Sequence, residues 1–357
     1  MPLLIVILGI LLLFVLIAKF KLNAFISFII VCVFVGVFQE MELDRIVEAI
    51  QIGMGNTLGF LVMILGLGAM LGKLVSDSGA AQRITSKLVS SFGIKYIQWA
   101  VVVAGFIVGI PMFYSVGFVI LIPLVFTIAA STGLPLIYVG LPMLASLSVT
   151  HGFLPPHPAP TAIAGMFNAD IGKTLLYGII IAIPTIIVAG PLFTRTIKNI
   201  KATPLKEFYN PIVLKEEEMP AMGISLFTTL LPIILILCST LFTLFVSGEF
   251  LLKEVIVFIG NPVIAMLISV LVAIYALGIS RGKQMPELMS SVSSSVSSIT
   301  MILLIIAGAG ALKQILVASG VSDYIGALLN GSSISPLILA WFIATVIRVC
   351  VGSATVA

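Results

Sequence analysis

The chain has 357 residues, of which 60% are hydrophobic and only 9% are charged, and its mean hydropathy is +1.28. Soluble globular proteins carry about 25% charged residues, so this composition excludes a soluble domain and predicts an all-α protein that crosses a membrane many times. The formal net charge of +4 comes from lysines and arginines in loops and gives no indication of nucleic-acid binding. Three cysteines without paired spacing, Cys32, Cys238 and Cys350, predict no metal site, disulfide framework or cofactor.

Apolar runs mark the membrane spans of the first half, because a spanning helix needs about 20 mostly apolar residues. The predicted spans are residues 3–18, 22–38, 56–75, 97–130, 135–149 and 174–194. Residues 39–52 are predicted as a short interfacial helix, and 161–172 as a short helix or re-entrant arm. The 97–130 run is too long for one span and contains Gly109–Gly117, so we expect a helix broken near the middle of the membrane.

A polar stretch at 195–221 divides the chain into an N-terminal half, 1–194, and a C-terminal half, 222–357. Because basic loops face the cytoplasm, this linker is expected to be cytoplasmic and the N-terminus external. The second half has predicted spans at 223–246 and 256–279, a serine-rich start at 289–300 leading into apolar 301–312, and a span from Pro336 that breaks at Arg348. The serine-rich start has two open interpretations, a polar cavity wall or simple helix packing.

Two stretches, Gly66–Gly79 and Gly308–Gly320, share glycines, a lysine, a Leu-Val pair and a closing Ser-Gly. Each precedes an amphipathic segment and a span that is predicted to break. The loop charges place the two copies in opposite orientations, so we predict inverted repeats that begin at about residues 56 and 289. Inverted repeats with broken helices are typical of secondary transporters; chance likeness between glycine-rich helices is the alternative.

Arg348 lies within an apolar run, where a charge costs about 2.5–3.5 kcal/mol on insertion scales. A guanidinium is suited to paired hydrogen bonds with a carboxylate, so an anionic substrate is the predicted partner. Small and hydroxyl-bearing residues beside it, suited to a polyhydroxy ligand, are Gly352, Ser353 and Thr355. The alternative is a structural ion pair with Asp77, Asp170 or Asp323.

The two equivalent turns of the repeats supply further candidates for substrate binding. Ser78 and Gly79 close the first copy, and Ser319 and Gly320 close the second, with backbone amides that can hold an anion. Asp77 can take a proton or a cation. Helix capping by these serines and by Asp77 is the alternative.

The stretch Thr150–Thr161 contains both histidines of the chain, His151 and His157, and four prolines. Proline removes backbone donors and disfavours α conformation in the residue before it, so the stretch is predicted to be non-helical. Such backbone is tolerated at membrane depth where it is buried in protein or lines a watery cavity. Either histidine can carry a coupled proton; the alternative is a histidine held by backbone carbonyls.

Three stretches, Gly68–Ala81, Thr150–Pro160 and Arg348–Ala357, resemble the gluconate permease family of bacterial proton symporters. The resemblance implies proton-coupled uptake of gluconate or a related sugar acid across the bacterial inner membrane, in a fold with inverted repeats and re-entrant hairpins. Relatives that take D-serine, glycerate or other hydroxy acids leave those substrates as alternatives. Members have a further C-terminal portion, so we expect a C-terminally incomplete member, with a non-transporting remnant as the alternative.

The resulting expectation is a symporter that binds a small carboxylate and protons in the lipid bilayer and works by alternating access. Sodium coupling is the alternative to protons, and a homodimer is the expected assembly. An intramembrane enzyme is not expected, because no His-Glu-x-x-His motif is present.

Overall fold

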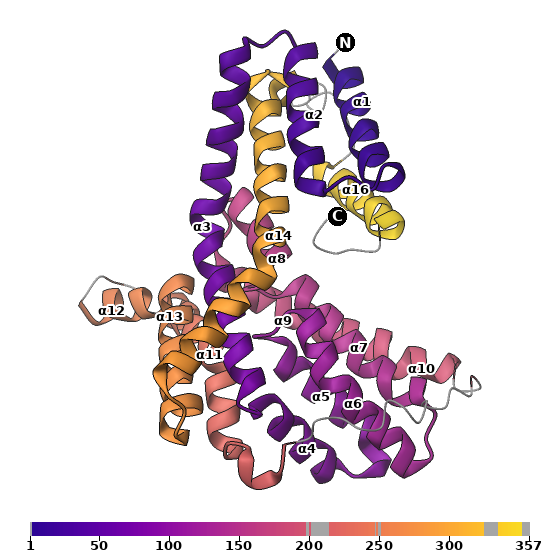
Figure 1. The fold of residues 1–357 in the computed structure, drawn as a ribbon, viewed down its shortest axis with the longest axis vertical. Helices are drawn as coiled ribbons and strands as arrows, with labels where there is room; N and C mark the ends of the chain where they lie inside the picture. Colours follow the sequence, from indigo (N-terminus) through magenta and orange to yellow (C-terminus); the bar gives the residue numbers. More distant parts are fainter. Residues whose placement is uncertain are drawn as a thin grey trace. The chain divides into compact units, whose positions relative to one another are not determined.

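The computed structural model describes residues 2–197, 200, 214–246, 248, 251–324 and 335–351 (Figure 1). Every regular element in these ranges is helical. The helices are α1 (Pro2–Phe14), η1 (Val15–Lys19), α2 (Ala24–Phe38), α3 (Leu43–Asp77), α4 (Ala80–Phe92), η2 (Ile94–Tyr96), α5 (Ile97–Gly109), α6 (Tyr114–Thr132), α7 (Leu136–Phe153), α8 (Pro158–Met166), α9 (Ile171–Ile187), η3 (Val188–Leu192), α10 (Phe193–Thr196), η5 (Glu216–Glu218), α11 (Met222–Phe245), α12 (Leu251–Gly260), α13 (Pro262–Ala273), η6 (Ile274–Gly278), η7 (Ile279–Arg281), α14 (Met285–Ala318) and α16 (Pro336–Val351).

Within the described ranges, six helices are long and apolar enough to cross a membrane, or up to eight if each bent pair counts as one span. Large apolar side chains stay exposed on many of them, for example Leu4, Tyr177 and Ile181. This is the surface expected of helices whose solvent is hydrocarbon. The prediction of an all-α protein with several membrane spans is therefore confirmed.

The chain forms two compact units. Unit 1 comprises Met1–Val62 with Ile299–Ala357, and unit 2 comprises Met63–Ser298. Both long helices, α3 and α14, contribute one part to each unit. The two predicted halves, with their linker at 195–221, stay a prediction.

One predicted boundary inside α3 is wrong. Residues 39–52 do not form a separate interfacial helix, because α3 begins at Leu43 and continues past residue 52, and its bend of 43° lies later, between Gly59 and Leu61. Gly53 and Gly55 keep their backbone N–H groups, so each costs only about 1 kcal/mol of helix propensity and does not end the helix. The prediction that the serine-rich start leads into the apolar run is confirmed, since α14 contains both and no proline follows Pro286 within it.

The prediction that the Thr150–Thr161 stretch is non-helical is wrong for most of its residues. Helix α7 continues through His151 to Phe153, and α8 begins at Pro158, which leaves only 154–157 non-helical. Pro158 and Pro160 lie in the first turn of α8, where backbone N–H groups have no intrahelical acceptor and proline is tolerated. Proline therefore starts a helix here instead of preventing one.

Two further breaks differ in outcome. The predicted break in the 97–130 run is confirmed, since α5 ends at Gly109 and α6 begins at Tyr114. The predicted break at Arg348 is not seen in the described residues, because α16 continues to Val351 without a residue that lacks an N–H. A break at Asn261, where the side chain caps α13 by accepting the Val263 N–H, was not predicted.

The closing turns of the two repeat copies have the same backbone conformation. Gly79 and Gly320 adopt left-handed φ values of 77° and 76°, a region that favours glycine. In both turns the preceding serine N–H bonds to the carbonyl four residues back, and the glycine carbonyl accepts the N–H four residues ahead. A helix of 35 residues precedes the first turn and one of 34 precedes the second.

In unit 1 the parts of α3 and α14 that belong to it run antiparallel. Gly53 lies against Ala311 and Gln314, and Thr57, one turn later in α3, lies against Gly310. The surrounding core contains Val31, Cys32, Val35, Ile46, Ala49, Ala311 and Ile315. Inverted repeats would place these two helices antiparallel, and the repeat itself stays a prediction.

Candidate functional site

The break between α5 and α6 is the centre of the candidate site in unit 2. Pro111 lacks a backbone N–H and stands inside the four-residue interruption 110–113. Phe113 then starts α6, and its carbonyl accepts the N–H groups of Val116 and Gly117 at 3.0 Å each. The N–H groups that precede Val116 in α6 have no intrahelical acceptor, which gives this end a partial positive charge.

Glycines bring neighbouring helices against the backbone of this break. A Cβ atom on Gly72 of α3 would lie 2.7 Å from the Pro111 carbonyl oxygen. A Cβ atom on Gly109 of α5 would collide with the Thr150 hydroxyl of α7. The absence of side chains at these two positions therefore allows α3 and α7 to approach the interruption.

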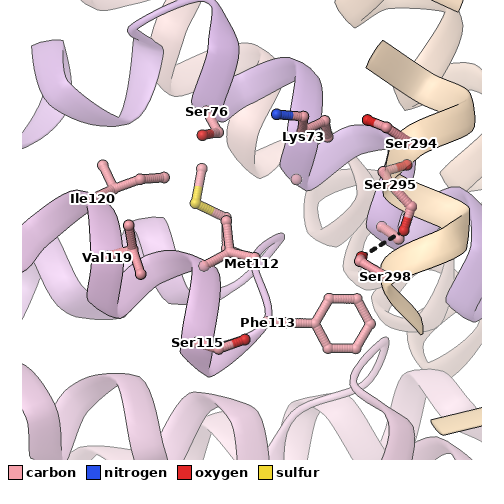
Figure 2. A pocket seen from close by; sticks show the side chains of 13 residues that line it. Lys73, Ser76, Met112, Phe113, Ser115, Val119, Ile120, Ser294, Ser295 and Ser298 are labelled. Atoms are coloured by element: carbon pink, nitrogen blue, oxygen red, sulfur yellow. Dashed lines mark hydrogen bonds between the residues drawn. The ribbon is translucent and has the colours of Figure 1, made fainter. Parts of the chain in front are cut away.

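A pocket of about 480 Å³ opens beside the break, and the described residues that line it come from α3, the interruption, α6 and α14 (Figure 2). Its polar lining consists of Lys73, Ser76, Ser115, Ser294, Ser295 and Ser298. Figure 2 shows Lys73 and the three α14 serines on one side and the apolar side chains of Val119 and Ile120 on the other. Lys73 is the one charged side chain among the described lining residues.

The α14 serines form a polar wall that is already hydrogen-bonded. The hydroxyls of Ser294, Ser295 and Ser298 each donate to the carbonyl three residues back, at 2.7, 2.6 and 2.6 Å. A serine hydroxyl has one donor hydrogen and two acceptor lone pairs. Each oxygen can therefore still accept a hydrogen bond from a molecule in the pocket.

Lys73 forms an ion pair with Asp77, one turn later on α3. The Lys73 Nζ atom lies 2.8 Å from Asp77 Oδ1, and the two side chains are 38% and 31% exposed. The other carboxylate oxygen of Asp77 accepts a hydrogen bond from the Ser291 hydroxyl of α14. This ion pair therefore links the pocket cation to the serine-bearing helix.

The two histidines lie together on the other side of Phe113. His151 Nδ1 and His157 Nδ1 are 3.2 Å apart, and His157 Nε2 lies 2.8 Å from the Gly109 carbonyl oxygen. Because a carbonyl only accepts, His157 Nε2 carries a hydrogen, and one proton is shared between the facing Nδ1 atoms. The Phe113 ring, which lines the pocket, is 6.0 Å from the His151 ring and 6.4 Å from the His157 ring.

His157 therefore matches the alternative interpretation of a histidine held by a backbone carbonyl. We expect His157→Ala to lower the free energy of unfolding by about 1–3 kcal/mol, since it leaves the Gly109 carbonyl without this donor. Thermal unfolding of the purified protein in detergent would measure the loss. His157→Gln, which retains an N–H donor, should recover part of it. An alanine variant as stable as the native chain would show that this bond does not hold the break.

The other predicted site residues lie elsewhere. The buried Ser78 donates to the Val75 carbonyl and accepts the Ala80 N–H, which is the capping arrangement named as its alternative. Ser78, Gly79, Ser319 and Gly320 are not among the described residues that line the pocket. Asp170, one of the acids considered for Arg348, caps α9 by accepting the Lys173 N–H at 2.6 Å.

Arg348 belongs to helix α16, and the position of its side chain is outside the described part of the structure. Gly352, Ser353 and Thr355 also lie outside the described residues. Their predicted role in substrate binding stays a prediction.

Sequence reasoning missed Lys73, Ser115 and Phe113 as pocket residues. An acid at i+4 on the same helix was a sequence signal for a paired charge at Lys73. The serine run was recognised, and the cavity-wall interpretation of it is the one that the structure supports.

Several membrane spans and a polar pocket beside a broken helix are features of a membrane permease. Comparison with known protein families gives the same class. The family model described as GntP family permease matches residues 1–357, so the chain belongs to this family. The predicted resemblance to the gluconate permeases is thereby confirmed. The chain is a membrane-embedded transporter of a small molecule and not an enzyme.

Several bacterial relatives match the whole chain. It is 51% identical to the high-affinity gluconate transporter of Escherichia coli K12, covering 82% of that protein, and 49% identical to the Gnt-II system L-idonate transporter of the same organism, covering 81%. It is 50% identical to the gluconate permease of Bacillus subtilis 168, covering 82% of it.

Proposed function

We propose that this chain is a proton-coupled symporter that imports gluconate or a closely related sugar acid across the bacterial cytoplasmic membrane by alternating access. The observation that carries the proposal is the pocket of unit 2, which combines one lysine with five serine hydroxyls among its described lining residues. A sugar acid has matching chemistry, namely one carboxylate followed by a chain of hydroxyls. The names of the relatives, gluconate and L-idonate transporters, support the same substrate class.

The arrangement of the polar side chains would orient the bound substrate. Lys73 would bind the carboxylate, because a charge-assisted hydrogen bond is stronger than one between neutral groups. Ser294 and Ser298 are four residues apart on α14, or about 6 Å along the helix axis, and would accept hydrogen bonds from successive hydroxyls of an extended chain. The partial positive charge at the start of α6, beside Ser115, favours a negatively charged ligand.

Two groups near the pocket can carry the coupled proton. The pair of His151 and His157 shares one proton between facing Nδ1 atoms and contacts Phe113, a lining residue. Asp77 is the ion-pair partner of the lysine that would bind the substrate. Protonation of either group would therefore change the charge close to the pocket.

Alternating access is supported by the repeat. The two copies have equivalent left-handed glycine turns, and α3 and α14 run antiparallel in unit 1. In secondary transporters with inverted repeats, one repeat rocks against the other around a central site.

A second set of substrate contacts, Arg348 with Gly352, Ser353 and Thr355, remains part of the proposal on sequence grounds. Arg348→Ala, compared with substitutions of Lys73, would show which cation binds the carboxylate. Loss of uptake in one variant alone identifies that residue.

Uptake by membrane vesicles tests the function directly. Vesicles containing the protein should accumulate radiolabelled gluconate when a proton gradient is imposed, and a protonophore should stop accumulation. Unlabelled L-idonate should compete more strongly than glycerate or D-serine, because the serine wall offers contacts along a longer chain. Accumulation that follows a sodium gradient instead, or no uptake of any sugar acid, would contradict the proposal.

A further inference from the structure

The carboxylate of Asp77 forms an ion pair with Lys73, the same lysine that would bind the substrate carboxylate. Lys73 lines the pocket, and its Nζ atom is 2.8 Å from Asp77 Oδ1, the geometry expected for a bound acid. Both side chains are about one third exposed, so the pair is accessible to an exchanging partner.

The charged and hydrogen-bonding groups around Asp77 come from two elements. On its own helix the facing group is Lys73. From the start of α14 and the turn before it, Ser291 bonds to the carboxylate, and Lys283 Nζ lies 3.4 Å from the Asp77 main-chain carbonyl. Lys283 is itself 3.8 Å from the carboxylate of Glu287, which offsets its charge.

We propose that Asp77 is an internal competitor for Lys73, and that its protonation releases this lysine to the substrate. The inference rests on the proposed function and specifies how its proton is coupled. In the empty site Lys73 and the ionised Asp77 have a net charge of zero. When a proton from water binds to Asp77 and a monocarboxylate binds to Lys73, the net charge is again zero.

Binding without the proton would place two carboxylates beside one ammonium group. A half-buried net negative charge is unfavourable, because burial weakens its solvation without supplying a partner. Ser291 can remain hydrogen-bonded to the neutral acid, since a carboxylic acid keeps acceptor capacity. Proton and substrate therefore favour each other's binding, and this coupling is reciprocal.

The coupling predicts a pH dependence that removal of one carboxylate should abolish. Over the pH range in which the linked proton is taken up, the affinity of the purified transporter for gluconate should fall about tenfold per unit rise in pH, as one linked proton requires. In Asp77→Asn the affinity should be independent of pH over the same range. Glu42→Gln, which neutralises an exposed carboxylate of unit 1 and spares Lys73, is the matched control and should retain the native dependence.

A measurement on the native chain makes the test independent of how well a variant folds. In weakly buffered detergent solution, native protein should take up about one proton per gluconate bound, recorded with a pH indicator. Asp77→Asn should bind gluconate and exchange it across vesicles but take up no proton and drive no accumulation.

The outcomes separate the two proposals. If the native chain binds no sugar acid, the proposed function fails. If it binds gluconate with proton uptake and Asp77→Asn does the same, symport stands and the competitor role of Asp77 is overturned. If the native chain binds gluconate without proton uptake, both proton coupling and the role of Asp77 are rejected.

Discussion

Replacing Lys73 by methionine should reduce the uptake of gluconate at low substrate concentration by roughly 10- to 150-fold. The variant keeps most of the side-chain volume and removes the one charge among the described residues lining the pocket. A hydrogen bond to a charged group contributes about 1.5–3 kcal/mol, and each 1.4 kcal/mol corresponds to about tenfold in affinity. Initial rates of radiolabelled uptake, normalised to the amount of protein in the membrane, would measure the effect.

Lys313 provides the matched control for this experiment. It occupies the corresponding position of the second repeat copy and is exposed on α14 in unit 1. Lys313→Met should transport at close to the native rate, and Lys73→Arg should retain more activity than Lys73→Met. If Lys73→Met transports normally while Arg348→Ala does not, the substrate carboxylate binds at Arg348 and the pocket assignment is wrong.

Gly53→Leu should prevent close packing of α3 and α14 in unit 1. A Cβ atom at Gly53 would lie 2.7 Å from the Gln314 Cβ atom and 2.8 Å from the Ala311 Cα atom, and the backbone cannot easily move away. Overpacking of this kind costs about 3 kcal/mol or more. We expect a clearly lower melting temperature in detergent and less folded protein in the membrane.

Gly55, two residues along the same helix, is the control for this substitution. A Cβ atom there would meet no described atom within 4 Å, so Gly55→Leu should fold and melt like the native chain. Equal stability of the two leucine variants would show that the contact between α3 and α14 does not support the fold.

The sequence predicted the membrane class and most spans because apolar runs report directly on burial in lipid. It also located the break at Gly109–Gly117, where proline and glycines interrupt an otherwise continuous run. The limits of α3 and α14 were harder to predict, since serine and glycine lower helix propensity without ending a helix. The extent of α7 was missed for a different reason, because Pro155 restricts mainly Leu154, the residue directly before it, and leaves 151–153 able to continue the helix.

The candidate site depends on contacts between distant parts of the chain, which spacing alone does not reveal. Lys73 and Ser294 are more than 200 residues apart, and only the structure shows that both line one pocket. Sequence reasoning favoured Arg348 because it is an isolated charge within an apolar run. The same reasoning did not select Lys73, because its position in the sequence does not show that it lines a pocket.

The α14 serines donate hydrogen bonds to carbonyls of their own helix, and this affects which ligands the pocket would select. Ser294, Ser295 and Ser298 already donate to their own helix, so in this state they offer acceptors to a ligand. A ligand that bonds to these serine oxygens must therefore supply the hydrogen-bond donors. A sugar acid whose hydroxyls are converted to methyl ethers keeps its length, its carboxylate and its oxygens, yet has nothing to donate. Under the proposed function, this wall would favour, among acids of equal charge, those with more O–H groups to donate.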